Sequence, residues 1–88
     1  MIKCEQMISN KGNAIANQFL IYANNGVYFQ SYRSIIALKQ NDGTIVLSEK
    51  YWDYSSTTSK YRNIFLGETT EQTRYQIKIG NYKLQKLN

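Results

Sequence analysis

The chain has no histidine, no proline and a single cysteine among its 88 residues. Histidine is the commonest general base and metal ligand, so its absence excludes Ser-His-Asp and Cys-His nucleophile systems. One cysteine, Cys4, excludes disulfide scaffolds and cysteine-based zinc clusters. We therefore expect a function that uses none of these groups.

Carboxylates and glycines are also few, with six of the former and five of the latter. The carboxylates form no close pair and no metal-loop pattern, and Asp42 and Glu71 fall in a predicted turn and a predicted helix cap. The scattered glycines form no phosphate-binding loop. The sequence thus predicts a protein that is not an enzyme and has no cofactor, no metal site and no catalytic residue.

A long hydrophobic run is missing as well. Residues 1–5 contain no apolar run, so we expect no signal peptide. The longest uncharged stretch, residues 12–32, is interrupted by asparagine and glutamine, whereas a membrane helix needs about 20 mostly apolar residues. We expect no membrane partner and a cytoplasmic location in a bacterial host cell. The bias towards residues with AT-rich codons indicates a low-GC bacterium or one of its phages.

The composition is that of a globular protein, with 42% hydrophobic and 19% charged residues, and the length fits a single domain over residues 1–88. Two turn signals divide its first half. Asn25-Gly26, between strand-forming runs, predicts a hairpin with a type I′ turn. Asp42-Gly43 predicts a second hairpin, in which a two-residue loop would place Leu38 opposite Leu47. A further short strand is expected over residues 2–8.

Helical signals follow in the second half. Serines and threonines before residue 60, apolar residues at helical spacing and Gly67 predict a helix over residues 57–66. Thr69 with Gln72 fits a capping box and predicts a second helix up to about Ile79, although alternating residues and Gly80-Asn81 also fit a hairpin. We expect an α+β fold, with an antiparallel meander of three to five strands and one or two C-terminal helices packed on one face. The expected core comprises Ile21, Ile36, Leu38, Ile45, Leu47, Ile64, Phe65 and Leu66.

Positive charge is concentrated in the same half. The formal net charge is +5, and residues 50–88 carry seven basic and three acidic side chains. Such a region suits nucleic acid or an acidic protein, although a solvated lysine-rich face explains it equally well. Tyrosines near the cations could stack bases or form protein hot spots, or could simply cap a small core. The candidate partner-binding or nucleic-acid-binding residues are Tyr28, Tyr32, Arg33, Lys60, Tyr61, Arg62, Arg74, Lys78, Lys83 and Lys86.

Residues 28–32, 34–37 and 51–63, together with the ending Gly80-Asn81-Tyr82-Lys83-Leu84, resemble a family of small phage and prophage proteins of unknown function. The resemblance extends from about Ser9 to Asn88 and carries over no functional residue. It implies an accessory protein of a mobile element. Proteins of this kind often bind and redirect host machinery, as anti-CRISPR and other anti-defence proteins do.

These observations together predict a non-enzymatic, phage-encoded binding protein that inhibits a host nucleic-acid-handling complex, such as a CRISPR effector. Its partner would be a host protein or ribonucleoprotein. The alternative is a small basic protein that binds DNA or RNA directly, with cations on phosphates and tyrosines on bases. A homo-oligomer is also compatible with the sequence, because an exposed hairpin edge can pair with a second copy.

Overall fold

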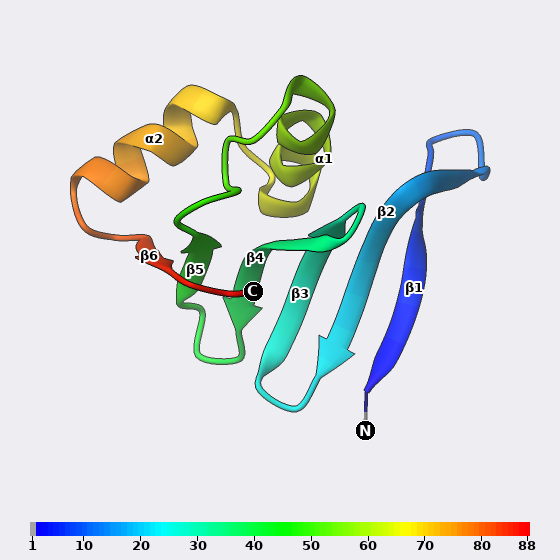
Figure 1. Cartoon of the computed structure of the whole chain (residues 1–88), viewed down its shortest axis with the longest axis horizontal. Helices are drawn as coiled ribbons and strands as arrows, with labels where there is room; N and C mark the ends of the chain where they lie inside the picture. Colours follow the sequence, from blue (N-terminus) through cyan, green and yellow to red (C-terminus); the bar gives the residue numbers. More distant parts are fainter. Residues whose placement is uncertain (1) are drawn as a thin grey trace.

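The computed structural model describes residues 2–88 and contains one six-stranded sheet with two helices (Figure 1). The strands lie in chain order across the sheet. Adjacent strands are antiparallel except β5 and β6, which are parallel. The elements are β1 (Lys3–Ile8), β2 (Ala14–Ala23), β3 (Gly26–Ser31), β4 (Ser34–Gln40), β5 (Ile45–Ser48), α1 (Ser56–Leu66), α2 (Thr70–Lys78) and β6 (Lys83–Gln85).

The predicted α+β class and both predicted helices are confirmed, but the limit of five strands is wrong. The additional strand is β6, which joins the sheet after the helices. Because α1 and α2 carry the chain back before it re-enters the sheet, β6 runs parallel to β5, so the sheet is not a pure antiparallel meander. Within α2 the capping box is formed by Thr69 and Gln72 as predicted, and the helical interpretation of this segment is confirmed.

The β2–β3 hairpin is present, but its turn lies one residue earlier than predicted. Ala23 pairs with Gly26, so Asn24 and Asn25 form the loop. Asn17 and Tyr32 are the only non-glycine residues within positions 2–88 that have positive φ. Asn25 therefore cannot occupy a central position of a type I′ turn, which needs positive φ at both central residues.

The predicted register of the β4–β5 hairpin is also wrong. Leu38 lies opposite Val46, and Leu47 lies opposite Ala37. The loop is longer than two residues. It is closed by the backbone N–H of Gln40, which donates to the carbonyl of Thr44 at 2.9 Å and leaves residues 41–43 between them. A shift of one residue exchanges the faces of a strand, so Leu38 points away from the face that carries Leu47.

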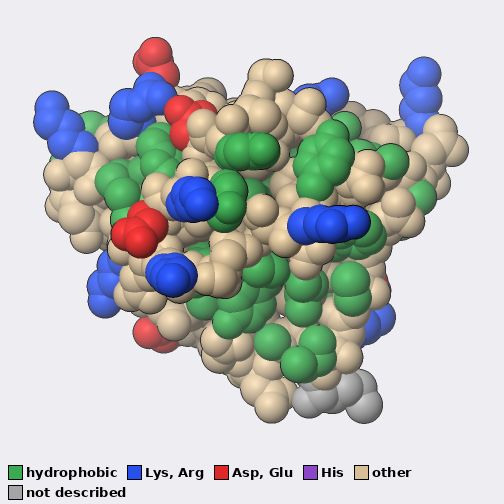
Figure 2. Space-filling view, in the orientation of Figure 1, with side chains coloured by type: hydrophobic (Ala, Val, Ile, Leu, Met, Phe, Trp, Pro, Cys, Tyr) green, Lys and Arg blue, Asp and Glu red, His purple; other side chains and the backbone are tan. Residues whose placement is uncertain are grey.

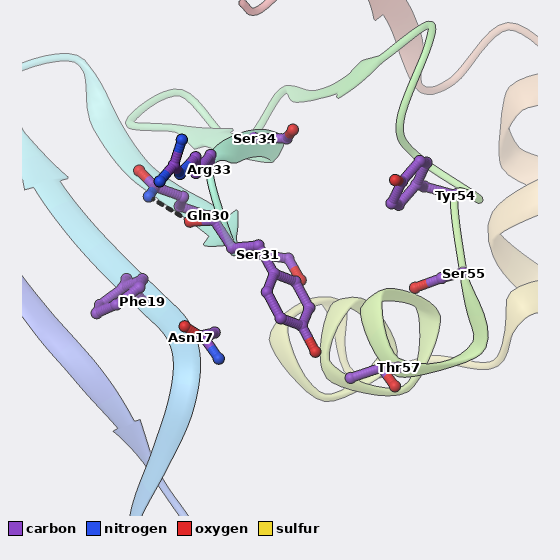
Figure 3. Close-up of a pocket in the computed structure, with 10 residues that line it drawn as sticks. Asn17, Phe19, Gln30, Ser31, Arg33, Ser34, Tyr54, Ser55 and Thr57 are labelled. Atoms are coloured by element: carbon purple, nitrogen blue, oxygen red, sulfur yellow. Dashed lines mark hydrogen bonds between the residues drawn. The ribbon is translucent and has the colours of Figure 1, made fainter.

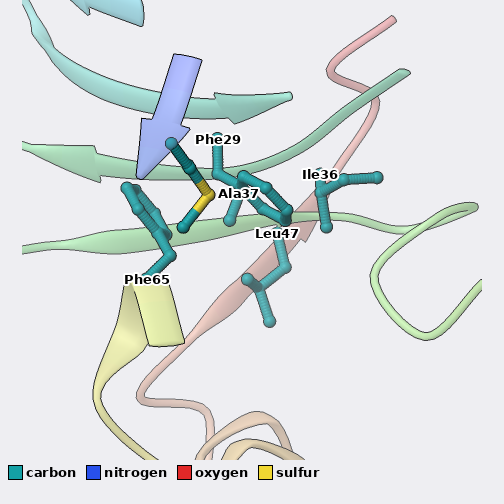
Figure 4. Close-up of a cluster of buried hydrophobic side chains, with 6 residues drawn as sticks. Phe29, Ile36, Ala37, Leu47 and Phe65 are labelled. Carbon is teal, nitrogen blue, oxygen red and sulfur yellow. The ribbon is translucent and has the colours of Figure 1, made fainter. Parts of the chain in front are cut away.

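The core lies between the helices and one face of the sheet (Figure 4). Phe65 of α1 stacks on Phe29 of β3 with 5.7 Å between the ring centroids. The buried cluster comprises Met7, Phe29, Ile36, Ala37, Leu47 and Phe65. Of the predicted core, Ile36, Leu38, Leu47 and Phe65 are buried, and Ile21, Ile45 and Leu66 are half-buried.

Ile64 was wrongly assigned to the core, since 58% of it is exposed. Helix α1 instead turns Thr58, Arg62 and Phe65 inwards. These positions follow helical spacing, and that periodicity places Ile64 on the other side of the helix. One polar and one charged side chain, Thr58 and Arg62, thus point inwards together with Phe65.

The other face of the sheet points away from the helices, and we call it the outer face. Side chains alternate between the two faces of a strand, so the outer face takes the residues between those of the core. A row of opposing residues crosses all six strands there, and Leu38 and Val46 are buried within it. The row comprises Cys4, Ile21, Tyr28, Leu38, Val46 and Lys83.

Candidate functional site

Arg62, one of the predicted binding residues, lies inside the protein. Its side chain is fully buried, and its guanidinium carbon lies 5.1 Å from the centroid of the Trp52 ring. It donates hydrogen bonds to the Trp52 carbonyl and, at 2.7 Å, to the Thr70 hydroxyl. Burial lowers the pKa of Arg62, and the nearby carboxylate of Asp53 acts in the opposite direction. Arg62 therefore links the segment before α1 to the start of α2.

Arg74 takes part in the same cluster from α2. Its guanidinium lies 5.8 Å from the Trp52 ring centroid and 3.2 Å from a carboxylate oxygen of Asp53. Asp53 also lies 3.6 Å from the Arg62 guanidinium. Trp52 is consequently contacted by two cations, which accounts for its position without a ligand.

The other predicted cations lie on separate parts of the surface. Lys60 contacts the ring of Tyr61 on α1, with 5.3 Å from its ammonium to the ring centroid. Lys78 is exposed at the end of α2, Lys83 is exposed on β6, and Lys86 is exposed in the C-terminal tail. Figure 2 shows Lys and Arg side chains dispersed over the visible face, with hydrophobic groups between them. Among the six cations predicted from Lys60 onwards, Arg62 and Arg74 both contact Trp52 and Asp53.

Tyr32 and Arg33 belong to a hollow of about 920 Å³ where β3 turns into β4 (Figure 3). We call it the β3–β4 hollow. It lies between the bent part of β2 and the start of α1. Its walls are formed by Asn17, Phe19, Gln30, Ser31, Tyr32, Arg33, Ser34, Tyr54, Ser55 and Thr57.

Two unusual backbone conformations shape this hollow. Asn17 has φ 64° and Tyr32 has φ 56°, and the N–H of Tyr32 donates to the carbonyl of Asn17 at 2.7 Å. Asparagine tolerates the left-handed region, whereas tyrosine adopts it only where the surrounding structure enforces it. Ser31 and Thr58 share a buried hydrogen bond of 2.9 Å between their hydroxyl groups. These contacts fix the β3–β4 turn against β2 and α1.

The lining combines aromatic rings with one cation. Phe19, Tyr32 and Tyr54 supply the rings, of which Tyr32 is 49% and Tyr54 is 64% exposed. Arg33 is the charged residue of the lining, which contains no carboxylate. Ser55 caps α1, whose first N–H groups carry partial positive charge. The hollow therefore suits a group that combines a planar or apolar surface with an acceptor or negative charge.

The lining holds hydroxyl groups but neither a carboxylate nor a thiol that could act as their base. Within residues 2–88 no group of three or more Cys, Asp and Glu side chains is placed to hold a metal ion. In the same part of the chain, neither helix is long and apolar enough to cross a membrane.

Sequence reasoning found part of the site. Tyr32 and Arg33, which are adjacent in the sequence, both line the hollow, but Tyr28 lies on the outer face, in the row that ends at Lys83. Phe19 and Tyr54 were missed as binding residues. The sequence contains a signal that could have identified Tyr54, because this residue belongs to the aromatic run of residues 51–54. Phe19 had none, because only the fold places its ring beside the turn.

Comparison with known proteins gives one match. The model of DUF8033, described as a family of unknown function, matches residues 2–81. No curated protein and no solved structure matches the chain.

Proposed function

The chain belongs to the DUF8033 family, whose function is unknown, and we propose that it is a non-enzymatic binding protein that recognises a macromolecular partner through the β3–β4 hollow. The observation that carries this proposal is the lining of the hollow. Tyrosine and arginine dominate the residues that contribute most to binding energy at protein interfaces. Here Tyr32, Arg33 and Tyr54 line one concave site, whose turn is already fixed in the unbound chain.

The partner we propose is a host protein or ribonucleoprotein complex that handles nucleic acid, such as a CRISPR effector, and binding would inhibit it. Two arguments support this class of partner. The first is the resemblance to small phage and prophage proteins that we infer from the sequence. The second is the formal net charge of +5, which favours an acidic partner surface. A hollow that contains Arg33 and no carboxylate would accept an acidic side chain from such a surface.

Inhibition of target cleavage by purified CRISPR effector–guide complexes tests the proposal. The protein should inhibit a susceptible effector near one-to-one stoichiometry, because it acts by occupying a surface. Arg33→Ala and Tyr54→Ala should each weaken inhibition by about tenfold or more. Lys78→Ala is the matched control, since Lys78 is exposed but lies outside the hollow.

Affinity capture from bacterial lysate provides the complementary measurement. Capture of a defined complex should survive nuclease treatment and should be lost in the Arg33→Ala and Tyr54→Ala variants. The proposal is overturned if the wild-type protein inhibits no effector and the hollow variants capture the same proteins as the wild type.

Direct binding of single-stranded nucleic acid is a second candidate, favoured by one observation on the outer face. Tyr28 and Lys83 lie in the same cross-strand row, and Phe19 projects from the same face two positions from Ile21. No residue of this row is acidic. Both rings are half-buried. Aromatic rings on a sheet can stack with bases, and cations on the same face can contact phosphates.

Salt dependence distinguishes this candidate from the first. Binding of a labelled single-stranded oligonucleotide should weaken as salt rises, with a log–log slope of about −0.7 for each phosphate contact. Tyr28→Ala and Lys83→Ala should each reduce the affinity for the oligonucleotide, whereas Tyr54→Ala should not. Absence of binding at low salt would eliminate direct nucleic-acid binding and leave the protein partner.

A further inference from the structure

Strand β1 forms one edge of the sheet, and its outer side has no neighbouring strand among residues 2–88. The strand spans Lys3–Ile8 and contains neither proline nor glycine, the residues that most often interrupt strand pairing. An edge of this kind presents unpaired backbone N–H and C=O groups in a row, which makes it a template for another strand.

Exposed apolar side chains gather at the same edge. Ile2 is 73% exposed and Ile8 is 67% exposed, one at each end of β1. Beside the strand, Met7, Tyr22 and Ile64 line a groove of about 340 Å³ on the helix-bearing side. The edge therefore combines unsatisfied backbone groups with apolar surface, and an added strand would satisfy the backbone groups.

The charges of β1 select which strand fits. Lys3 and Glu5 lie on one face of the strand, and their side chains form an exposed ion pair with an N–O distance of 2.7 Å. A second β1 related by a two-fold axis perpendicular to the sheet would pair antiparallel, with like faces together. If Cys4 lies opposite Cys4 of the second copy, each Lys3 faces a Glu5. The next register of the same parity instead places the two Glu5 carboxylates opposite each other, which is unfavourable.

We propose that two copies of this chain associate through antiparallel pairing of their β1 strands, in the register that places Cys4 opposite Cys4 and Lys3 opposite Glu5. The pairing joins the two sheets into one continuous sheet. It uses the free edge of the sheet and not the β3–β4 hollow, since no residue of β1 lines that hollow. This inference is therefore independent of the proposed function.

Charge exchange across the interface tests the register. Molecular mass measured by light scattering over a concentration series should show a dimer for the wild type. Lys3→Glu places one glutamate opposite each Glu5, and Glu5→Lys places one lysine opposite each Lys3. Each variant should raise the dimer dissociation constant by roughly tenfold or more, because two like-charged pairs replace two attractive ones.

The double variant Lys3→Glu/Glu5→Lys should restore dimerisation, because opposite charges again face each other. Lys11→Glu is the control for a change of net charge outside β1. All these positions are exposed or half-buried, so far-UV circular dichroism should show unchanged folding. A wild type that stays monomeric at every concentration, or a double variant that fails to recover, would overturn the proposal.

Crosslinking at Cys4 reports the same register independently. Opposing Cα atoms in an antiparallel pair are about 4.5–5.5 Å apart, which lies within the range that a disulfide spans. Diamide should oxidise the two thiols to a disulfide, taking up the two electrons and two protons that they release. A covalent dimer should form in the wild type and in the double variant, and much less in Lys3→Glu. Equal crosslinking in all three would contradict the proposed register.

Discussion

The guanidinium of Arg62 lies on the ring of Trp52, 5.1 Å from the ring centroid, and the Arg62 side chain is fully buried. Two further contacts hold this pair in place, since Arg62 also donates to Asn63 and Thr70. Together, the contact between Arg62 and Trp52 and these hydrogen bonds join α1, α2 and the segment before α1. The role of Arg62 is thus structural, whatever partner the surface binds.

Replacement of this residue should reveal that role. Arg62→Ala should lower the free energy of unfolding by about 2–4 kcal/mol, because it removes buried hydrogen bonds and leaves Asp53 with a weaker counter-charge. Arg74→Ala is the matched control, since Arg74 contacts the same ring and carboxylate from an exposed position and should cost less than about 1 kcal/mol. Urea denaturation followed by far-UV circular dichroism measures both, and equal losses would contradict the buried role.

Local signals were enough to predict the helices of this fold. Ser55 caps α1, Gly67 ends it, and Thr69 with Gln72 opens α2. Caps and stops depend on hydrogen bonds between residues a few positions apart, so they can be recognised in the sequence. Strand β6 could not be recognised in the same way, because its three residues are stabilised by pairing with a distant part of the chain.

Register and the candidate site depended on contacts that the sequence does not display. The loop between Leu38 and Val46 is longer than its Asp-Gly signal implied, and this moves Leu38 to the other face. Arg62 was interpreted as a surface cation because charge is the strongest signal of an arginine. The hollow depends on positive φ at Asn17 and Tyr32, which the folded strands impose on residues that do not prefer it.

The close approach of Gly26 to β4 gives a second prediction. A Cβ atom at Gly26 would lie 2.1 Å from the carbonyl oxygen of Lys39, so the backbone must shift to accept it. Gly26→Ala should lower the free energy of unfolding by at least about 2 kcal/mol. Gly12→Ala is the control: Gly12 has φ 83° but open space around it, so strain of about 1 kcal/mol is expected. Thermal denaturation compares them, and similar losses would show that the contact at Gly26 is relieved without cost.

The hydrogen bond between Tyr82 and Glu68 predicts a dependence of stability on high pH. The Tyr82 hydroxyl donates to the Glu68 carboxylate at 2.7 Å, and burial together with this carboxylate raises the pKa of Tyr82 to about 12. The ordinary pKa of a tyrosine, expected in the unfolded chain, is 10.0, so between these pH values the folded state binds up to one proton more than the unfolded state. The contribution of Tyr82 to the free energy of unfolding is therefore complete below about pH 10, and it falls as the pH rises towards 12.

Tyr82→Phe isolates this contribution. The variant should be less stable than the wild type at neutral pH, because Glu68 loses a hydrogen-bond donor. The difference between the two proteins should shrink between pH 10 and 12, where only the wild type loses the Tyr82 contribution. Urea denaturation at a series of pH values measures the difference, and a constant gap across this range would contradict the assigned pKa.

The backbone of Tyr32 allows strain and binding to be separated by two substitutions at one position. Glycine is ordinarily about 0.5–1 kcal/mol less stable than alanine in a strand or helix, because it loses more conformational freedom on folding. At φ 56° the order should reverse, since alanine keeps a strain of about 1–2 kcal/mol that glycine does not have, and this exceeds the ordinary penalty of glycine. Tyr32→Gly should therefore be more stable than Tyr32→Ala in urea denaturation.

Both variants lose the ring from the β3–β4 hollow, so both should bind the partner about tenfold or more weakly. If alanine is the more stable of the two, the surrounding strands do not impose the left-handed conformation; if both bind normally, the ring of Tyr32 is not part of the binding surface.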